Sequence, residues 1–144
     1  MKKYVLALDE GTTSCRAILF DQKLNPVSVS SHELVCYYPK PSWVEQNPVD
    51  IYANQYSAMT ECIAKSGVKA SEISAIGITN QRETVIAWER STGKPLYNAI
   101  IWQCRRTMEY CERIENEYGG FTEASVSSVY SSKRRETADP IFNK

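Results

Sequence analysis

The chain has 144 residues, of which 42% are hydrophobic and 24% charged, and its 17 basic side chains balance its 17 acidic ones. This length can bury one compact core. The zero net charge argues against a nucleic-acid or membrane-surface partner held by bulk charge. No apolar run approaches the roughly 18 residues that cross a bilayer, and the first run, residues 4–8, is too short for a signal peptide. We therefore expect a cytoplasmic protein that neither binds nucleic acid nor inserts into a membrane.

The beginning of the chain predicts three strands. Residues 4–8 form a continuous apolar run, typical of a buried strand, and a second apolar run follows at residues 15–20. The polar loop between them contains Gly11, and two strands joined by a short glycine-containing loop favour a β-hairpin. Residues 27–35 alternate well enough for a third, edge-like strand. The chain is therefore predicted to open as an antiparallel meander.

A helix is predicted after a proline-rich loop at residues 37–47. Asn47 can cap this helix, Pro48 suits its first position, and Gly67 can end it. Four apolar side chains recur at spacings of four, three and four, as one face of a helix requires: Tyr52, Tyr56, Met59 and Ile63. These four residues form the expected apolar face of the helix.

The second half of the chain alternates strand and helix signals. Residues 73–79 predict a buried strand, which should run parallel to the first group because a helical crossover precedes it. Strand-like segments follow at residues 84–88 and 96–102, joined by a turn. Residues 105–118 have the charge pattern of an exposed helix. This order of elements predicts an α/β fold.

The polar loop at residues 9–14 is a candidate phosphate site. Glycine and small hydroxyl residues can offer N–H and O–H donors to phosphate oxygens. Asp9, at the end of the preceding strand, can hold a hydrated Mg²⁺, and Arg16 adds positive charge nearby. The loop is not a Walker motif, because it lacks G-x-x-x-x-G-K-[ST] and leads into a strand. On these residues alone, a plain hairpin turn is an equal alternative.

Two further features suit a polyol. Arg82 and Glu83 follow a predicted strand, where ligands gather in α/β folds, and such a pair can donate to one hydroxyl and accept from the next. The alternative is a surface ion pair. Trp102 can pack its indole on the carbons of a polyol, although a tryptophan alone is more often part of a core or an interface.

Four blocks of sequence, in order, carry a resemblance to a known family. They are residues 6–14 with Arg16, residues 38–46, residues 75–84 and residues 92–107. Together they extend from residue 3 to about residue 113, and they resemble the N-terminal part of the FGGY family of carbohydrate kinases, in its glycerol kinase branch. Two small departures, which should not remove a ligand contact, are Cys15 and Ser42, where the family has serine and glycine.

The resemblance implies the N-terminal domain of a ribonuclease-H-like (actin-like ATPase) α/β fold, incomplete here, with an antiparallel meander plus parallel strands. Such domains bind ATP between two lobes. The resemblance also implies that Thr12, Thr13 and Ser14 meet the nucleotide phosphates, and that Thr12 meets the transferred group. Arg16 would assist, and Asp9 would serve the Mg²⁺ that accompanies ATP.

A glycerol site is implied as well. Arg82 and Glu83 would hold the hydroxyls of glycerol, with Trp102 against its carbons. The family has a further tyrosine at glycerol, and Tyr130 is its nearest counterpart here, in a shifted register. The implied reaction is ATP-dependent phosphorylation of glycerol to glycerol 3-phosphate, for glycerol catabolism, by an enzyme that is homo-oligomeric at full length.

The resemblance also limits what the chain is expected to do. Residues 1–113 are expected to belong to the N-terminal kinase lobe, and residues 114–144 to be a divergent, disordered or non-native tail. The family's general base, an aspartate, comes much later in its sequences, so the chain alone is expected to be inactive. Three alternatives stay open: another FGGY kinase, acting on xylulose, gluconate or ribulose; a non-catalytic product of a truncated gene; and an actin-like assembly module.

Overall fold

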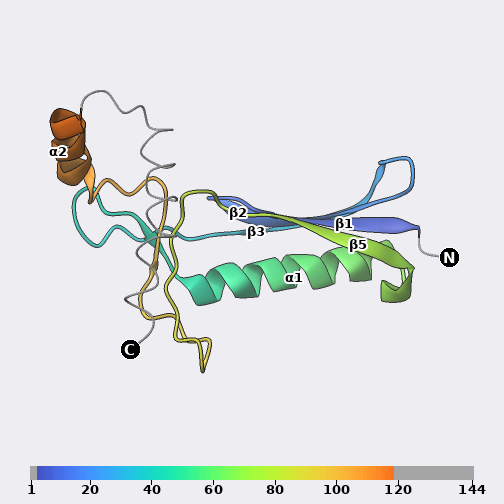
Figure 1. The fold of residues 1–144 in the computed structure, drawn as a ribbon. Helices are drawn as coiled ribbons and strands as arrows, with labels where there is room; N and C mark the ends of the chain where they lie inside the picture. Colours follow the sequence, from blue (N-terminus) through green and yellow to red (C-terminus); the bar gives the residue numbers. More distant parts are fainter. Residues whose placement is uncertain (1–2, 119–144) are drawn as a thin grey trace. The chain divides into compact units, whose positions relative to one another are not determined.

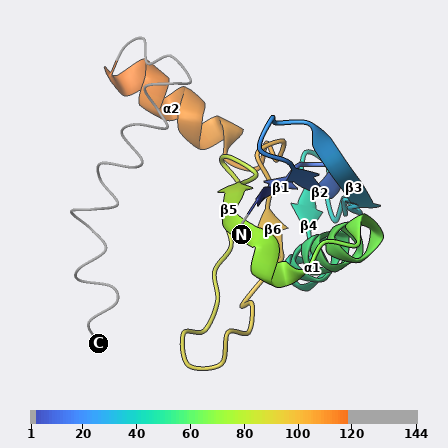
Figure 2. The same cartoon turned by 90° about the vertical axis from the view of Figure 1, so that its right-hand side faces the viewer.

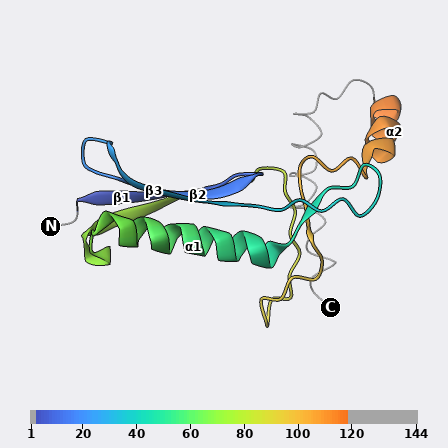
Figure 3. The same cartoon turned by 180° about the vertical axis from the view of Figure 1, so that it is seen from behind.

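The computed structural model describes residues 3–118, which fall into two units divided between Cys104 and Arg105. The first unit is a four-stranded sheet with one long helix along one of its faces (Figures 1 and 3). The second unit contains the helix α2, Met108–Tyr118, which confirms a helix where the charge pattern predicted one. Tyr130 and the whole of residues 119–144 lie outside the described residues, so the expected tail stays a prediction.

The sheet confirms the predicted meander and its parallel addition. Its strands lie in the order β3-β2-β1-β5. They are β1 (Tyr4–Glu10), β2 (Ser14–Phe20), β3 (Pro26–Glu33) and β5 (Ile73–Thr79). Neighbours β1, β2 and β3 pair antiparallel, whereas β5 pairs parallel with β1. The parallel pair needs a long crossover, and the helix α1 (Pro48–Ser66) with the 3₁₀ turn Ala70–Glu72 supplies it.

Both predicted ends of α1 are confirmed. The Asn47 side chain accepts a hydrogen bond from the Val49 N–H at 3.0 Å, which satisfies one of the donors left free at a helix start. Pro48 occupies the first position, where its missing N–H costs nothing. Gly67 ends the helix in the left-handed conformation, with φ of 67°, where a side chain would be strained.

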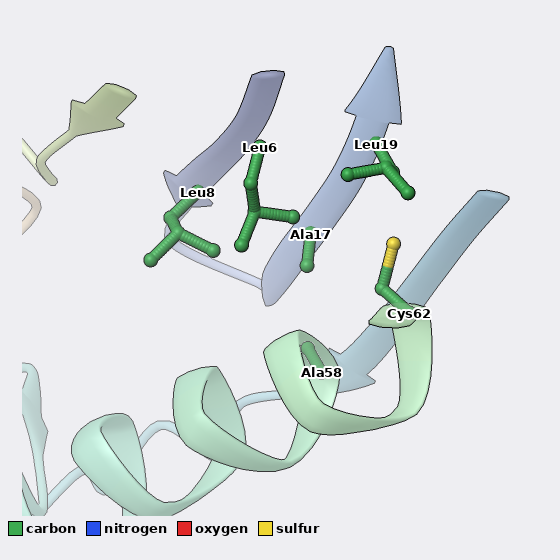
Figure 4. Close-up of a cluster of buried hydrophobic side chains, with 6 residues drawn as sticks. All are labelled: Leu6, Leu8, Ala17, Leu19, Ala58 and Cys62. Carbon is green, nitrogen blue, oxygen red and sulfur yellow. The ribbon is translucent and has the colours of Figure 1, made fainter. Parts of the chain in front are cut away.

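The core lies between α1 and the sheet (Figure 4). Its buried members come from β1, β2 and α1: Leu6, Leu8, Ala17, Leu19, Ala58 and Cys62. Met59 and Ile63, predicted on the apolar face of the helix, pack against this cluster and are partly buried. Leucines from two strands therefore meet small side chains from the helix, so that α1 can lie close to the sheet.

The prediction that Tyr52 and Tyr56 also belong to the buried face of α1 is wrong. The buried residues of α1 are Gln55, Ala58 and Cys62, at spacings of three and four. Tyr52 is 74% exposed and Tyr56 is 55% exposed, and their rings stack with centroids 6.3 Å apart. The predicted positions and the buried positions both have helical spacing. The buried set has the smaller side chains, and it faces the sheet because it lets α1 approach the strands more closely.

Strand β5 is also less buried than its apolar sequence predicted. Ile76 and Ile78 are 55% and 68% exposed. Each is paired in register with a buried leucine of β1, so both lie on the face of the sheet that α1 covers. The helix packs mainly on β2 and β3, however, and does not extend over β5 (Figure 2).

The segment after β5 contains less strand than predicted. Residues 84–88 form no strand, and their pairing is limited to two isolated bridges, Val85 with Ile100 and Trp88 with Pro95. The strand expected at residues 96–102 is reduced to β6, Ala99–Ile100. It pairs antiparallel with β4, Glu45–Gln46, inside the segment predicted as a proline-rich loop. Within the described residues, no helix is long and apolar enough to cross a membrane.

Truncation of Leu19 tests the core between α1 and the sheet. Leu19 is fully buried, so Leu19→Ala should lower the free energy of unfolding by about 2–5 kcal/mol, measured by urea titration. Leu96 is 69% exposed and is the matched control, since Leu96→Ala should change that energy by less than about 0.5 kcal/mol. Equal losses in both variants would contradict the assignment of the core.

Candidate functional site

The candidate phosphate loop lies beside the segment that carries Arg82 and Glu83. Strands β1 and β5 run in the same direction, with Asp9 opposite Thr79 in the register. Their carboxyl ends therefore lie at the same edge of the sheet, where binding sites of α/β folds gather. The loop after β1 and the loop after β5 both begin at this edge, although residues of the two loops are about 70 positions apart in sequence.

The phosphate loop is a tight turn that requires its glycine. The Gly11 N–H donates to the Ser14 carbonyl at 3.1 Å, which closes the turn between β1 and β2. A Cβ atom at Gly11 would lie only 2.8 Å from that same carbonyl oxygen. Any larger residue would push the turn open, so the glycine is needed for close approach within the backbone itself.

Two glutamine side chains hold this loop from inside. Gln46, in β4, donates from Nε2 to the Thr12 carbonyl at 2.7 Å. Gln81, just after β5, donates to the Gly11 carbonyl at 3.2 Å and to Oε1 of Gln46 at 3.3 Å. The Thr84 hydroxyl donates to Oε1 of Gln81 at 2.6 Å. Sequence reasoning gave neither glutamine a role, because an amide has no acid, base or nucleophilic signature.

Trp102 contacts the phosphate loop directly. Its indole Nε1 donates to the Thr12 hydroxyl at 2.8 Å. The tryptophan is 55% exposed, so it is not a core residue. An indole N–H can only donate, so the Thr12 oxygen accepts this bond and keeps its own hydrogen for another acceptor. The hydrogen bond thus joins Trp102, the predicted polyol contact, to the predicted phosphate loop.

Glu45 fixes the segment that leads to Trp102. This carboxylate is 1% exposed, and it accepts hydrogen bonds from the Tyr97 hydroxyl and from the Asn98 amide, both at 3.0 Å. A buried carboxylate is costly unless it is hydrogen-bonded, so this arrangement strongly favours one position for residues 97–98. The role of Glu45 was not predicted, since its block of sequence was expected to be a loop.

The charged groups at the end of β1 face one another across the hairpin. Arg16 lies opposite Asp9 in the register, and its guanidinium is 3.9 Å from the Asp9 carboxylate, with both side chains about half exposed. Burial raises the pKa of the neighbouring Glu10 carboxyl. Burial also raises the pKa of Cys15 to about 11, helped by the negative charges of Glu10 and Asp9.

Arg82 and Glu83 do not form an ion pair with each other, which was the alternative to a polyol site for these two residues. The ion pairs of the described residues include Arg16 with Asp9 and Glu61 with Lys65. Arg82 and Glu83 are both exposed, and Glu83 has a φ of 60°, in the left-handed region that is uncommon for this residue type. Such backbone conformations are frequent where a side chain must be aimed at a ligand.

Comparison with known proteins gives consistent matches. Residues 4–132 match the family described as "FGGY family of carbohydrate kinases, N-terminal domain". A glycerol kinase of Desulforamulus reducens is 59% identical over 114 residues, which are 79% of this chain and 23% of that protein. A glycerol kinase of Klebsiella pneumoniae is 57% identical over 116 residues, or 81% and 23% of the two proteins. The chain therefore spans less than a quarter of the length of the curated relatives it matches.

Solved structures agree with these sequences. A crystal structure of Plasmodium falciparum glycerol kinase with ADP superposes with a TM-score of 0.71 at 37% identity, covering 81% of this chain and 23% of that one. A xylulose kinase from Brucella ovis gives a TM-score of 0.73 at 26% identity, over 79% of this chain and 24% of that one. The fold predicted from the resemblance, that of the actin-like ATPases, is confirmed.

Exchange of the Trp102 indole proton tests its bond to Thr12. Thr12→Val removes the acceptor, so exchange of this N–H with solvent should speed up about fivefold, as loss of a bond worth about 1 kcal/mol would give. Exchange is measured by NMR on the indole signal. Thr13→Val is the matched control and should leave the rate unchanged. An unchanged rate in Thr12→Val would show that this hydrogen bond does not form in solution.

Alkylation of Cys15 tests the electrostatics of the hairpin. Because Cys15 is fully buried and its pKa is raised to about 11, iodoacetamide should label Cys15 slowly in the folded chain at pH 8. Labelling should rise towards pH 11, and Glu10→Gln should shift this rise to lower pH. The rates are followed by mass spectrometry of the Cys15 peptide, with the chain unfolded in urea as the control. Rapid labelling of Cys15 in the folded chain at pH 8, or the same pH dependence in Glu10→Gln, would contradict the shift.

Proposed function

The chain belongs to the FGGY family of carbohydrate kinases, and from this premise we propose that it is part of a kinase that phosphorylates glycerol with ATP. The product is glycerol 3-phosphate. Identities of 57–59% to glycerol kinases, against 26% to the xylulose kinase structure, favour glycerol over xylulose. The main structural support is the hydrogen bond from Trp102 to Thr12, because it joins the polyol segment to the phosphate loop.

The nucleotide phosphates are proposed to lie against the loop between β1 and β2. Thr12, Thr13 and Ser14 supply hydroxyl and amide donors, and Arg16 adds positive charge. The Thr12 hydroxyl is suited to this role, since it accepts from Trp102 and has its hydrogen left to donate to a phosphate oxygen. The Plasmodium relative that superposes on this chain was solved with ADP, which supports a nucleotide here.

Asp9 is proposed to serve the metal. Its carboxylate is about half exposed at the end of β1, and no group of three or more metal-ligating side chains occurs in the described part of the chain. A single carboxylate with water in the other positions fits Mg²⁺, which dehydrates reluctantly. When bound, Mg²⁺ would neutralise charge on the phosphates of ATP.

Glycerol is proposed to lie between Trp102 and the loop after β5. Arg82 donates to its hydroxyls, Glu83 accepts from them, and the indole of Trp102 covers its carbons. Tyr130 is proposed as a further contact, outside the described residues. The group that accepts the proton of the attacking hydroxyl is proposed to lie outside these 144 residues, so the chain binds its ligands without turning them over.

Ligand titrations of the ¹⁵N-labelled chain test this proposal. MgADP should shift the amide signals of residues 12–14, and glycerol should shift the indole signal of Trp102 and the amides of residues 82–83. Xylulose at the same concentration should leave those signals in place. Glu83→Gln keeps the size of the side chain but weakens its acceptor, so it should raise the concentration of glycerol needed.

Release of ADP on addition of glycerol supplies the second measurement. The chain alone should show no release above the rate without glycerol. Turnover at the rate of a complete kinase would show that a catalytic base is present within the chain. Shifts with xylulose but not glycerol would support another sugar kinase of the same family. The absence of any shift with either ligand would support a non-catalytic product and contradict the proposal.

A further inference from the structure

The carbonyl groups of the phosphate loop are all bonded within the protein. Gln81 donates to the carbonyl of Gly11, and Gln46 donates to that of Thr12. The next two carbonyls, of Thr13 and Ser14, accept from backbone N–H groups at 2.8 and 3.1 Å. Every carbonyl oxygen from residue 11 to residue 14 therefore has a donor, and the first two of these donors are glutamine side chains.

The amide hydrogens of the same loop are not occupied in this way. In residues 3–118, neither the Thr12 N–H nor the Thr13 N–H has a hydrogen-bond partner. A trans peptide directs its carbonyl and its N–H to opposite sides. Because the carbonyls of Gly11 and Thr12 are held by the glutamines, the N–H groups of Thr12 and Thr13, which share those peptides, point away from them.

We propose that Gln46 and Gln81 are positioning residues for the phosphate loop. By holding two consecutive carbonyls on the inner side, they turn the N–H groups of Thr12 and Thr13 towards the side where an anion can be bound. Successive N–H groups on one side of a turn form an anion-binding concavity. The phosphate role of these N–H groups rests on the proposed function, whereas the orientation of the loop by the glutamines does not.

The burial of Gln46 gives this arrangement its rigidity. The side chain is 1% exposed, and both ends of its amide are used, since Nε2 donates to Thr12 and Oε1 accepts from Gln81. A flip of the amide would place its oxygen against the carbonyl oxygen of Thr12. In a buried site an unpaired polar atom is costly, so only one orientation of Gln46 is favourable.

The arrangement also connects the two loops of the candidate site. Gln81 precedes Arg82 directly, and its own Oε1 is fixed by the Thr84 hydroxyl at 2.6 Å. Hydrogen bonds therefore run from Thr84 through Gln81 and Gln46 to the backbone of Thr12. The loop with the proposed glycerol contacts and the loop with the proposed phosphate contacts are thus held in one network.

Backbone order parameters of the ¹⁵N-labelled chain test the positioning role. In the wild type, Thr12 and Thr13 should have values near 0.85, as in rigid backbone, and in Gln46→Leu they should fall below about 0.6. Gln46→Glu, which keeps the size but replaces the donor, should behave like Gln46→Leu. Gln81→Leu is the second variant and should lower the value of Thr12, whose N–H shares a peptide with the Gly11 carbonyl.

Gln55 supplies the matched control. It is also buried, and its Nε2 also donates to a backbone carbonyl, that of Arg16 at 3.2 Å, but outside the loop. Gln55→Leu should therefore leave the order of Thr12 and Thr13 at the wild-type values. Wild-type order in both Gln46→Leu and Gln81→Leu, or equal disorder in Gln55→Leu, would overturn the positioning role.

A titration with MgADP separates this inference from the proposed function. If the amides of Thr12 and Thr13 shift with MgADP in the wild type, Gln46→Leu should need at least fivefold more ligand, while Gln55→Leu should not. Unchanged affinity in Gln46→Leu would overturn the link between positioning and phosphate binding. If MgADP shifts neither amide in the wild type, the phosphate role fails, while the order parameters still decide whether the glutamines position the loop.

Discussion

Parallel pairing of β1 with β5 decides which loops can meet at the candidate site. The register places Asp9 opposite Thr79, so both strands deliver their following loops to one edge of the sheet. An antiparallel β5 would put Gln81 at the opposite edge, near Lys3, where it could not reach the phosphate loop. The direction of β5 depends in turn on α1, whose length carries the chain back along the sheet before β5 begins.

The region around β4 is held by polar contacts, unlike the apolar core between α1 and the sheet. The core contains leucine, alanine and cysteine, whereas the two residues of β4, Glu45 and Gln46, are polar and each only 1% exposed. Their side-chain hydrogen bonds include those with Tyr97, Asn98, Thr12 and Gln81. Two buried polar residues thus connect segments that are far apart in the sequence. Hydrogen bonds are directional, so they fix the relative positions of these segments, whereas hydrophobic contact alone only keeps them close together.

Much of the fold could be predicted from local signals. The caps of α1 at Asn47 and Gly67 and the meander follow from rules that involve only a few neighbouring residues. The exposure of Tyr52 could not be predicted in this way, because it depends on which face meets the sheet. Strand β4 was missed for the same reason, since its pairing with β6 is invisible within residues 37–47.

In the candidate site, too, some features could be predicted from local sequence and others could not. Candidate roles for Thr12 and for Arg82 could be proposed from residue type and spacing. The parts played by Gln46 and Gln81 could not, because an amide acquires a role only from the groups placed around it. The bond from Trp102 to Thr12 joins residues 90 positions apart, so it is far less local than the contacts within the meander and α1. During synthesis, the meander and α1 can therefore assemble well before this bond can form, and the chain would pass through a stage with a folded sheet and an open, unassembled site.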